Sequence, residues 1–224
     1  MLGYKTEFWK NYTLRANLAT GSRSPNLAEL ASNGVHEGTN RFEIGNSSLD
    51  KEQNYQFDLS LEFSNQHLEL SADGFFNRIN DFIFIEPENR FIGEEQVFNF
   101  IQTDAELYGG EINLHLHPHP FDWLHWESSF EMVFGKVVDG EDLPLIPAKT
   151  WSNTLRVEFP QVGKLQNIFA YLKHQNTFEQ NKVSSFETPT DGYDLFSAGL
   201  GTDISINQVT LQVSVIGTNL IDET

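Results

Sequence analysis

The sequence contains no cysteine, and several other features that would assign it to a class of protein are also missing. Without cysteine, a disulfide framework, a thiolate zinc site and a cysteine nucleophile are all excluded. No stretch approaches the ~18 consecutive apolar residues that a membrane-spanning helix needs. The first residues, "MLGYKTEFWKNY", have no long apolar core and so do not form a secretory signal. We therefore expect either a cytoplasmic protein or a piece of a longer secreted precursor.

Basic residues are scarce, with 14 Lys and Arg against 32 Asp and Glu and a formal net charge of −18. Phosphate recognition depends on Lys and Arg, so this balance argues against a nucleic-acid-binding protein. The acidity fits a solvated surface or a compartment that attracts cations. The sequence also lacks a G-x-S-x-G elbow, an H-E-x-x-H motif and a phosphate loop. We therefore predict that the chain is not an enzyme.

What the sequence does contain is a regular alternation of apolar and polar residues. In "NYQFDLSLEF", Asn54–Phe63, every second side chain is apolar, which gives an extended strand one apolar and one polar face. The alternating runs exceed the ~5–6 residues usual in soluble sheets, and several exceed the ~9–11 with which a tilted strand crosses a bilayer. We predict an all-β, antiparallel up-and-down meander of about nine long strands, at Phe8–Ala19, Gln53–Ser64, His67–Ile85, Ala105–His117, Trp123–Gly135, Thr150–Phe159, Leu165–Phe178, Tyr193–Ile206 and Val209–Gly217.

The connections between these runs alternate between long and short. Antiparallel neighbours joined in this way place all long loops at one end of the sheet and all short turns at the other, as in an outer-membrane barrel. Long loops are expected at about Thr20–Glu52, Glu86–Asp104, Lys136–Lys149 and Glu179–Gly192, and short turns at Asn65–Gln66, Pro118–Asp122, Pro160–Lys164 and Asn207–Gln208. The first long loop should contain a short helix, with Ser24 as N-cap, Pro25 at the first helical position and Gly34 at its end.

Several segments, in order along the chain, resemble TonB-dependent outer-membrane receptors. "RSPNLAELASNGVHEGTNRFEIGNSSLDKEQ", Arg23–Gln53, is similar to a family segment that runs R-x-P-x-x-x-E-L, Gly-x-His and E-x-G-N-x-x-L-x-x-E. "SADGFFNRINDFIFI" and "QTDAELYGGEINL" resemble two of the family's strands, and "LPLIPA" resembles the loop before a late strand. "TNLIDET" is similar to the sequence before the last strand. The chain departs from the family at Lys51, where Pro is common, and at Ile221, where Phe is usual.

The resemblance implies a 22-stranded barrel with a plug domain in its lumen. Such a receptor lies in the outer membrane of a Gram-negative bacterium and imports a scarce ligand, an iron–siderophore or other metal complex, with energy supplied by TonB. Residues 1–224 would form a C-terminal portion of the barrel, without the plug, the TonB box and the last strand. No resident cofactor is implied, and a bound metal ion would be transported or adventitious. The alternative is a soluble β-sandwich or small barrel that binds glycan or protein, and a hydrolytic enzyme on a β scaffold is the third interpretation.

The implied partners are the TonB complex, reached through the N-terminal region of the receptor, the ligand, and outer-membrane lipid. About nine strands of a 22-stranded barrel leave two unpaired edges, which neither lipid nor water tolerates well. We therefore expect the isolated chain to close as a smaller barrel or a curved sheet, or to self-associate through its open edges.

Five residues of the first two long loops are candidate ligand contacts. His36, Glu37, Arg41 and Glu43 lie in the first loop, and Arg90 lies in the second. If these loops are extracellular, the side chains could contact an incoming ligand, and Arg90 could pair with an anionic siderophore. The resemblance equally suits a structural role, in which the first four residues tie their loop to the barrel mouth through hydrogen bonds and ion pairs.

A cluster of histidines in "NLHLHPHPFDWLHWE" is a candidate metal site. By alternation His115 and His117 share the polar face of one strand, and His125 and Glu127 join that face from the next strand. A register that pairs residue 115 with residue 125 would gather three imidazoles and a carboxylate, which are ligand types suited to zinc. The other interpretation is that these side chains are polar filler of the lumen near its periplasmic rim.

Overall fold

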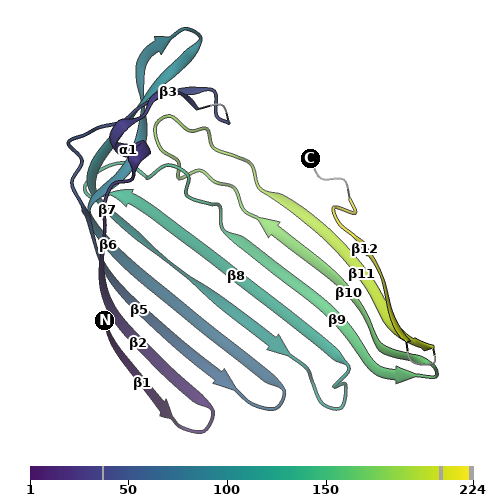
Figure 1. The fold of residues 1–224 in the computed structure, drawn as a ribbon. Coiled ribbons are helices and arrows are strands. Elements are labelled where there is room, and N and C mark those ends of the chain that lie inside the picture. Colours follow the sequence, from purple (N-terminus) through teal and green to yellow (C-terminus); the bar gives the residue numbers. More distant parts are fainter. Residues whose placement is uncertain (37, 207–208, 222–224) are drawn as a thin grey trace.

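The chain folds into one antiparallel sheet that is curved and open (Figure 1). The structure, a computed structural model, describes residues 1–36, 38–206 and 209–221. Among these residues the two end strands do not pair with each other, and each strand on the main path pairs with the next. That path is β1 (Leu2–Phe8), β2 (Tyr12–Arg23), β5 (Glu52–Ser64), β6 (Leu68–Ile92), β7 (Glu95–Leu116), β8 (Leu124–Val137), β9 (Thr150–Val162), β10 (Leu165–Thr177), β11 (Tyr193–Ile206) and β12 (Val209–Gly217).

The predicted all-β meander is confirmed, but two of its strand boundaries were wrong. The first predicted run, Phe8–Ala19, is mostly β2, and the strand before it, β1, was not predicted; Trp9 and Asn11 adopt positive φ angles of 46° and 77° and turn the chain between the two strands. The second predicted long loop is mostly strand, since β6 has 25 residues and β7 has 22, with Gly93 at their turn. The two strands pair with each other far beyond the alternating segment, and that pairing depends on cross-strand contacts more than on local pattern.

The alternation of long and short connections is confirmed except between β6 and β7, where the predicted long loop is a long hairpin closed by a tight turn at Gly93. The long connections lie at the end of the sheet where β3 and the helix are labelled, and the short turns lie at the other end (Figure 1). The predicted turn at residues 207–208 lies outside the described residues. We call the two ends of the sheet the long-loop end and the short-turn end.

The apolar residues of the alternating strands lie on the outside of the sheet. Along β5, the exposed fractions of Tyr55, Phe57, Leu59 and Leu61 are 51%, 42%, 44% and 41%. In register with Leu61 are Leu14 on one side and Ala72 on the other, so the apolar row continues across strands. A soluble sandwich would bury these side chains in its own core. The buried apolar residues lie instead near the long-loop end, and they include Leu49, Ile83, Ile85, Val97, Ala105 and Leu143.

The polar residues of the same strands line the concave face. One groove of about 560 Å³ is lined by Glu62 of β5, Asn113 of β7, Thr154 of β9 and Lys173 of β10. Side chains of so many strands can share a groove only where the sheet curves around it. Nearby on this face Asp73, Glu111 and Glu131 stand directly opposite one another on β6, β7 and β8. Like charges in register repel, so this row requires a hydrated face or counter-charges.

The first long connection contains a helix and a small hairpin. The helix α1 spans Leu27–Ala31, and the hairpin consists of β3 (Asn33–His36) and β4 (Arg41–Ile44), which pairs in parallel with β7. The helix was predicted, but its N-cap is Asn26, not Ser24, and it ends at Ala31 well before Gly34. Asn26 is the N-cap because it forms a reciprocal capping box with the third helical residue. No helix in the described part of the chain is both long and apolar enough to cross a membrane.

Candidate functional site

The first long loop is fastened to the sheet by a network around Arg23. Its guanidinium donates to both carboxylate oxygens of Glu52, at 2.7 and 2.6 Å, and to both oxygens of Glu29, at 2.9 Å each. Glu52 also accepts a hydrogen bond of 2.8 Å from the backbone N–H of Ile83 on β6. The helix, β2, β5 and β6 therefore meet at one charge-assisted cluster, the kind of contact that is stronger than neutral hydrogen bonds.

These hydrogen bonds shift the acid–base equilibria of the network. Burial acts to raise the pKa of Glu52, but the hydrogen bonds from Arg23 and from the Ile83 amide outweigh it and hold that pKa below its ordinary value. The bond to Glu52 raises the pKa of Arg23. Glu52 is the first of the 13 residues of β5, so it lies outside the ~9–11 residues that cross a bilayer.

A close backbone contact completes this anchor. The N–H of Gly45 donates to the Ser32 carbonyl at 2.7 Å, and the N–H of Asn46 donates to the Glu29 carbonyl at 2.8 Å. A Cβ at Gly45 would lie 2.5 Å from the backbone nitrogen of Ala31, so no larger residue fits without moving the helix. Most residues of the R-x-P-x-x-x-E-L and E-x-G-N-x-x-L-x-x-E segments thus belong to one structural anchor.

The candidate residues of the hairpin are engaged with one another. Arg41 Nε donates to Glu43 Oε1 at 2.8 Å, and the Arg41 guanidinium lies 5.4 Å from the centre of the Phe98 ring. Glu43 is buried, with an exposed fraction of 6%. His36 is exposed, and its Nδ1 lies 3.3 Å from the Thr39 hydroxyl. Arg41 and Glu43 therefore hold the hairpin in place, whereas His36 is accessible.

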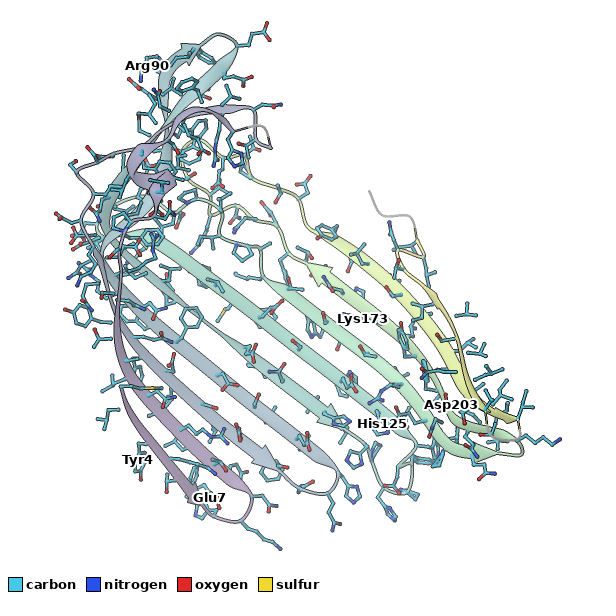
Figure 2. The ribbon with its side chains drawn as sticks, in the orientation of Figure 1. Tyr4, Glu7, Arg90, His125, Lys173 and Asp203 are labelled. Carbon is cyan, nitrogen blue, oxygen red and sulfur yellow. The ribbon has the colours of Figure 1, made fainter. Side chains whose placement is uncertain are left out.

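The other two loop candidates are placed differently. Glu37 lies outside the described residues. Arg90 lies at the far tip of the β6–β7 hairpin, well away from the short-turn end where His125 lies (Figure 2). Its Nε is hydrogen-bonded to Glu88 at 3.1 Å, and the side chain is about half exposed. Arg90 and His36 are thus the candidates open to an incoming ligand.

The long loops also form a small groove at this end. It has a volume of about 270 Å³ and is lined by the acids Glu86, Glu141 and Asp142, the hydroxyls of Thr103 and Ser184, and Phe186. The Phe186 ring stands edge-on to Phe98 at a centroid distance of 6.1 Å, which ties the last long loop to β7. These residues could not be predicted as a group from the sequence, because the β6–β7 pair and two loops far apart in sequence bring them together and no local pattern signals that contact.

At the short-turn end, five histidines gather. Neighbouring ring centroids are 5.3–5.7 Å apart along the series His119, His67, His117, His115 and His125. His115 Nε2 lies 3.0 Å from His125 Nδ1, within hydrogen-bond distance. The structure does not have the register that would pair residue 115 with residue 125: residue 115 pairs with Glu127, and residue 116 pairs with Trp126.

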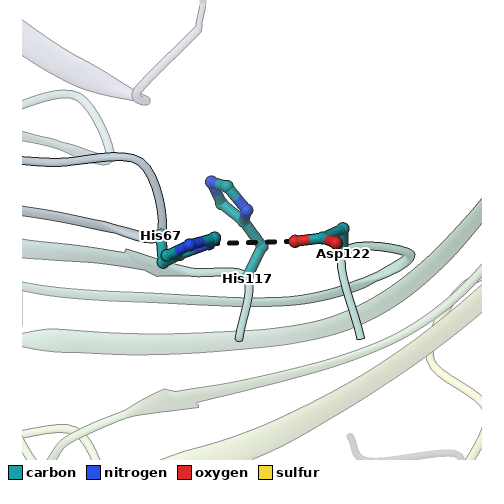
Figure 3. A group of neighbouring side chains, drawn as sticks. All are labelled: His67, His117 and Asp122. Atoms are coloured by element: carbon teal, nitrogen blue, oxygen red, sulfur yellow. Dashed lines mark ion pairs between the residues drawn. The ribbon is translucent and has the colours of Figure 1, made fainter. Parts of the chain in front are cut away.

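The predicted metal ligands are therefore close together, but they do not form the tightest group. Burial and the charge of Arg156 lower the pKa of His125, while Glu127 pairs with Arg156 at 2.7 Å. In the described part of the chain, the group whose ligand atoms all lie within 4.8 Å of one another is His67, His117 and Asp122 (Figure 3). His67 and Asp122 were missed in the sequence, because only the packing of two separate turns brings them together.

Comparison with known proteins gives this geometry its context. The profile of the family described as TonB dependent receptor-like, beta-barrel matches residues 2–220. The chain belongs to this family of β-barrel receptors, whose members are outer-membrane proteins of Gram-negative bacteria and not enzymes.

Solved structures share the fold. The copper transporter OprC superposes with a TM-score of 0.80 at 20% sequence identity, over 98% of this chain and 32% of its own. The siderophore receptor PirA from Acinetobacter baumannii gives 0.68 at 17% identity, over 97% of this chain and 36% of its own. A mutant of the ferric enterobactin receptor PfeA from Pseudomonas aeruginosa gives 0.66 at 18% identity, over 98% and 34%. The chain thus spans about a third of the length of the receptors it matches.

Proposed function

We propose that the chain is part of the barrel wall and extracellular loops of an active importer in the outer membrane of a Gram-negative bacterium. The observation that carries the proposal is the asymmetry of the sheet. Elaborate long connections gather at one end, short turns occupy the other, the exposed face is apolar and the concave face is polar. That combination suits a wall with lipid outside and a hydrated lumen inside.

The two ends then have different roles. The long-loop end holds the ligand, with His36 and Arg90 as accessible contacts and with the acidic groove of Glu86, Glu141 and Asp142 at the same end of the sheet. The Arg23 network keeps the first loop in position for that contact. Energy for uptake comes from the TonB complex, which acts on parts of the receptor outside this chain.

Iron–siderophore complexes are the first ligand class to test, and other metal complexes are the second. Two of the similar structures are a siderophore receptor and a ferric enterobactin receptor, and a third is a copper transporter. An exposed Arg90 suits an anionic chelate, because a guanidinium donates to carboxylate or catecholate oxygens in a planar fork.

The test is growth of a strain from which the whole receptor gene is deleted, under separate iron and zinc limitation. We expect slower growth under at least one limitation, restored by the intact gene but not in a strain that also lacks TonB. Growth that is unaltered under both limitations would contradict the proposal for either metal.

A second arm locates the contact. In the complemented strain, Arg90→Ala should weaken binding of the ferric siderophore that supports growth. Lys164 is another exposed basic residue and lies in the turn between β9 and β10, at the short-turn end. Lys164→Ala is therefore the matched control and should leave binding unchanged. If the two substitutions had equal effects on binding, Arg90 would not be a ligand contact.

A further inference from the structure

The short-turn end carries a group of side chains that the import function does not use. His67 lies in the turn between β5 and β6, His117 follows β7 directly, and Asp122 lies in the turn before β8. One potential ligand atom from each lies within 4.8 Å of the other two. His67 Nδ1 and Asp122 Oδ1 face each other at 3.8 Å (Figure 3).

The backbone holds the two turns together. The N–H of His117 donates to the carbonyl of His67 at 2.9 Å, which fixes these residues side by side. The turn with Asp122 is closed by bonds from Phe121 N–H to the Pro118 carbonyl, at 2.7 Å, and from Leu124 N–H to the Phe121 carbonyl, at 2.8 Å. The convergence of the three side chains is therefore built into the fold.

One of the facing atoms lacks a partner. His67 Nδ1 is buried from solvent at the atom level and has no hydrogen-bond partner, although its side chain as a whole is partly exposed. A buried imidazole nitrogen without a partner costs free energy. A bound cation would satisfy it. Asp122 uses Oδ2 toward His119 Nδ1, at 3.3 Å, which leaves Oδ1 directed to His67.

We propose that His67, His117 and Asp122 form a binding site for a divalent first-row transition-metal ion at the short-turn rim of the barrel wall. Two imidazoles and one carboxylate are a ligand set that suits Zn²⁺, with the fourth position left to water or to His119. Bonds of about 2.0–2.2 Å place tetrahedral ligand atoms about 3.3–3.6 Å apart. The three side chains lie in or beside turns. Rotation about their side-chain bonds would bring the ligand atoms from within 4.8 Å of one another to that spacing. The site does not depend on which ligand the receptor imports.

Two further imidazoles lie next to the proposed ligand set. The rings of His115 and His125 lie 5.4 and 5.6 Å from the His117 ring. They are held in turn by Glu69, 3.8 Å from His115, and Glu158, 3.8 Å from His125. Glu69 adds negative charge on this side of the rim, which favours a cation there, whereas the charge of Glu158 is offset by its ion pair with Arg156.

The experiment is a calorimetric titration of the full receptor with ZnCl₂, after purification in detergent, removal of any affinity tag and treatment with chelator. We expect the receptor to bind one equivalent of zinc. His117→Ala, His67→Ala and Asp122→Asn should each lower its affinity more than about 100-fold, since even residues outside the ligand set typically contribute 10–100-fold to metal affinity. The control is His174→Gln, because His174 lies near the end of β10 that faces the long loops, away from the proposed site. This variant should bind the zinc equivalent as tightly as the unchanged receptor. Unchanged thermal unfolding of each variant shows that the fold is intact.

Three results would overturn the proposal. The first is equal zinc binding by the receptor and its His117→Ala variant, and the second is binding only at millimolar zinc. The third is loss of the equivalent in His115→Ala together with its retention in His67→Ala, which would place the ion on the lumen histidines instead. Each of these results leaves the growth test of the import function unaffected.

Discussion

At the scale of single residues, the contact between Arg23 and Glu52 decides how the first long loop responds to acid. The pKa of Glu52 is depressed in the folded protein. Its stabilising contribution is therefore complete above the ordinary glutamate pKa of about 4.3 and is lost as pH falls through the lower folded value. Between pH 6 and pH 3 we expect the thermal unfolding midpoint of the full receptor to fall more steeply than that of its Glu52→Gln variant. Parallel curves would show that this carboxylate does not control the acid response.

Gly45 provides a second residue-scale test with a control in the same loop. In Gly45→Ala the new methyl group would meet the backbone atoms of Leu30, Ala31 and Ser32 at 2.5–2.7 Å. We expect a loss of about 1–3 kcal/mol, the range for overpacking, and faster tryptic cleavage at Lys51. Gly34→Ala adds a methyl group with nothing within 4 Å and should change neither. If both variants have the same stability and the same rate of cleavage at Lys51, the contact between Gly45 and the backbone of the helix is not what holds the helix in place.

The residues that the sequence could identify are those whose partners lie in one recognisable segment. Arg23, Glu29 and Gly45 fall within the segment that resembles the family, and the structure joins them in one anchor. The resemblance could not say whether such residues contact ligand or hold the loop. His67 and Asp122 could not be paired at all, because their approach depends on the register of β6 with β7 and on the shape of a turn.

At the scale of elements, the two faces of β5 should respond differently to charge. Leu59 lies on the apolar exposed face near the middle of the strand, and Ser60 lies beside it on the polar face between Arg15 and Asp73. In lipid vesicles we expect Leu59→Lys to destabilise the full receptor by about 2–4 kcal/mol, as for lysine at the bilayer midplane. Ser60→Lys should cost well under half of that, because it enters a hydrated face beside a carboxylate.

Denaturant unfolding of the two variants in vesicles measures the difference. A larger loss in Ser60→Lys than in Leu59→Lys would reverse the assignment of the two faces, and with it the barrel interpretation. The sequence could predict these faces because the period of two is local. It could not predict the extra length of β6 and β7, since Phe91 and its neighbours become strand through pairing across the hairpin.

At the scale of the whole molecule, the sheet has two edge strands, β1 and β12. Among the described residues, β1 pairs only with β2 and β12 pairs only with β11, so each presents an open edge. Open edges recruit other strands. Refolded alone in detergent, residues 1–224 should therefore elute as an oligomer in size-exclusion chromatography with light scattering. A stable monomer would mean that the chain closes its own sheet in solution.

The central claim is that this sheet is one part of a larger receptor barrel, and the reading frame on both sides of the gene segment tests it most directly. We expect several hundred upstream codons that encode a signal peptide, a TonB box and a plug domain. We also expect one more strand downstream that ends in Phe or Trp. A frame that starts at Met1 and stops after Thr224 would show that this sheet is not part of a larger receptor barrel, and the alternation in Asn54–Phe63 would then need a different explanation.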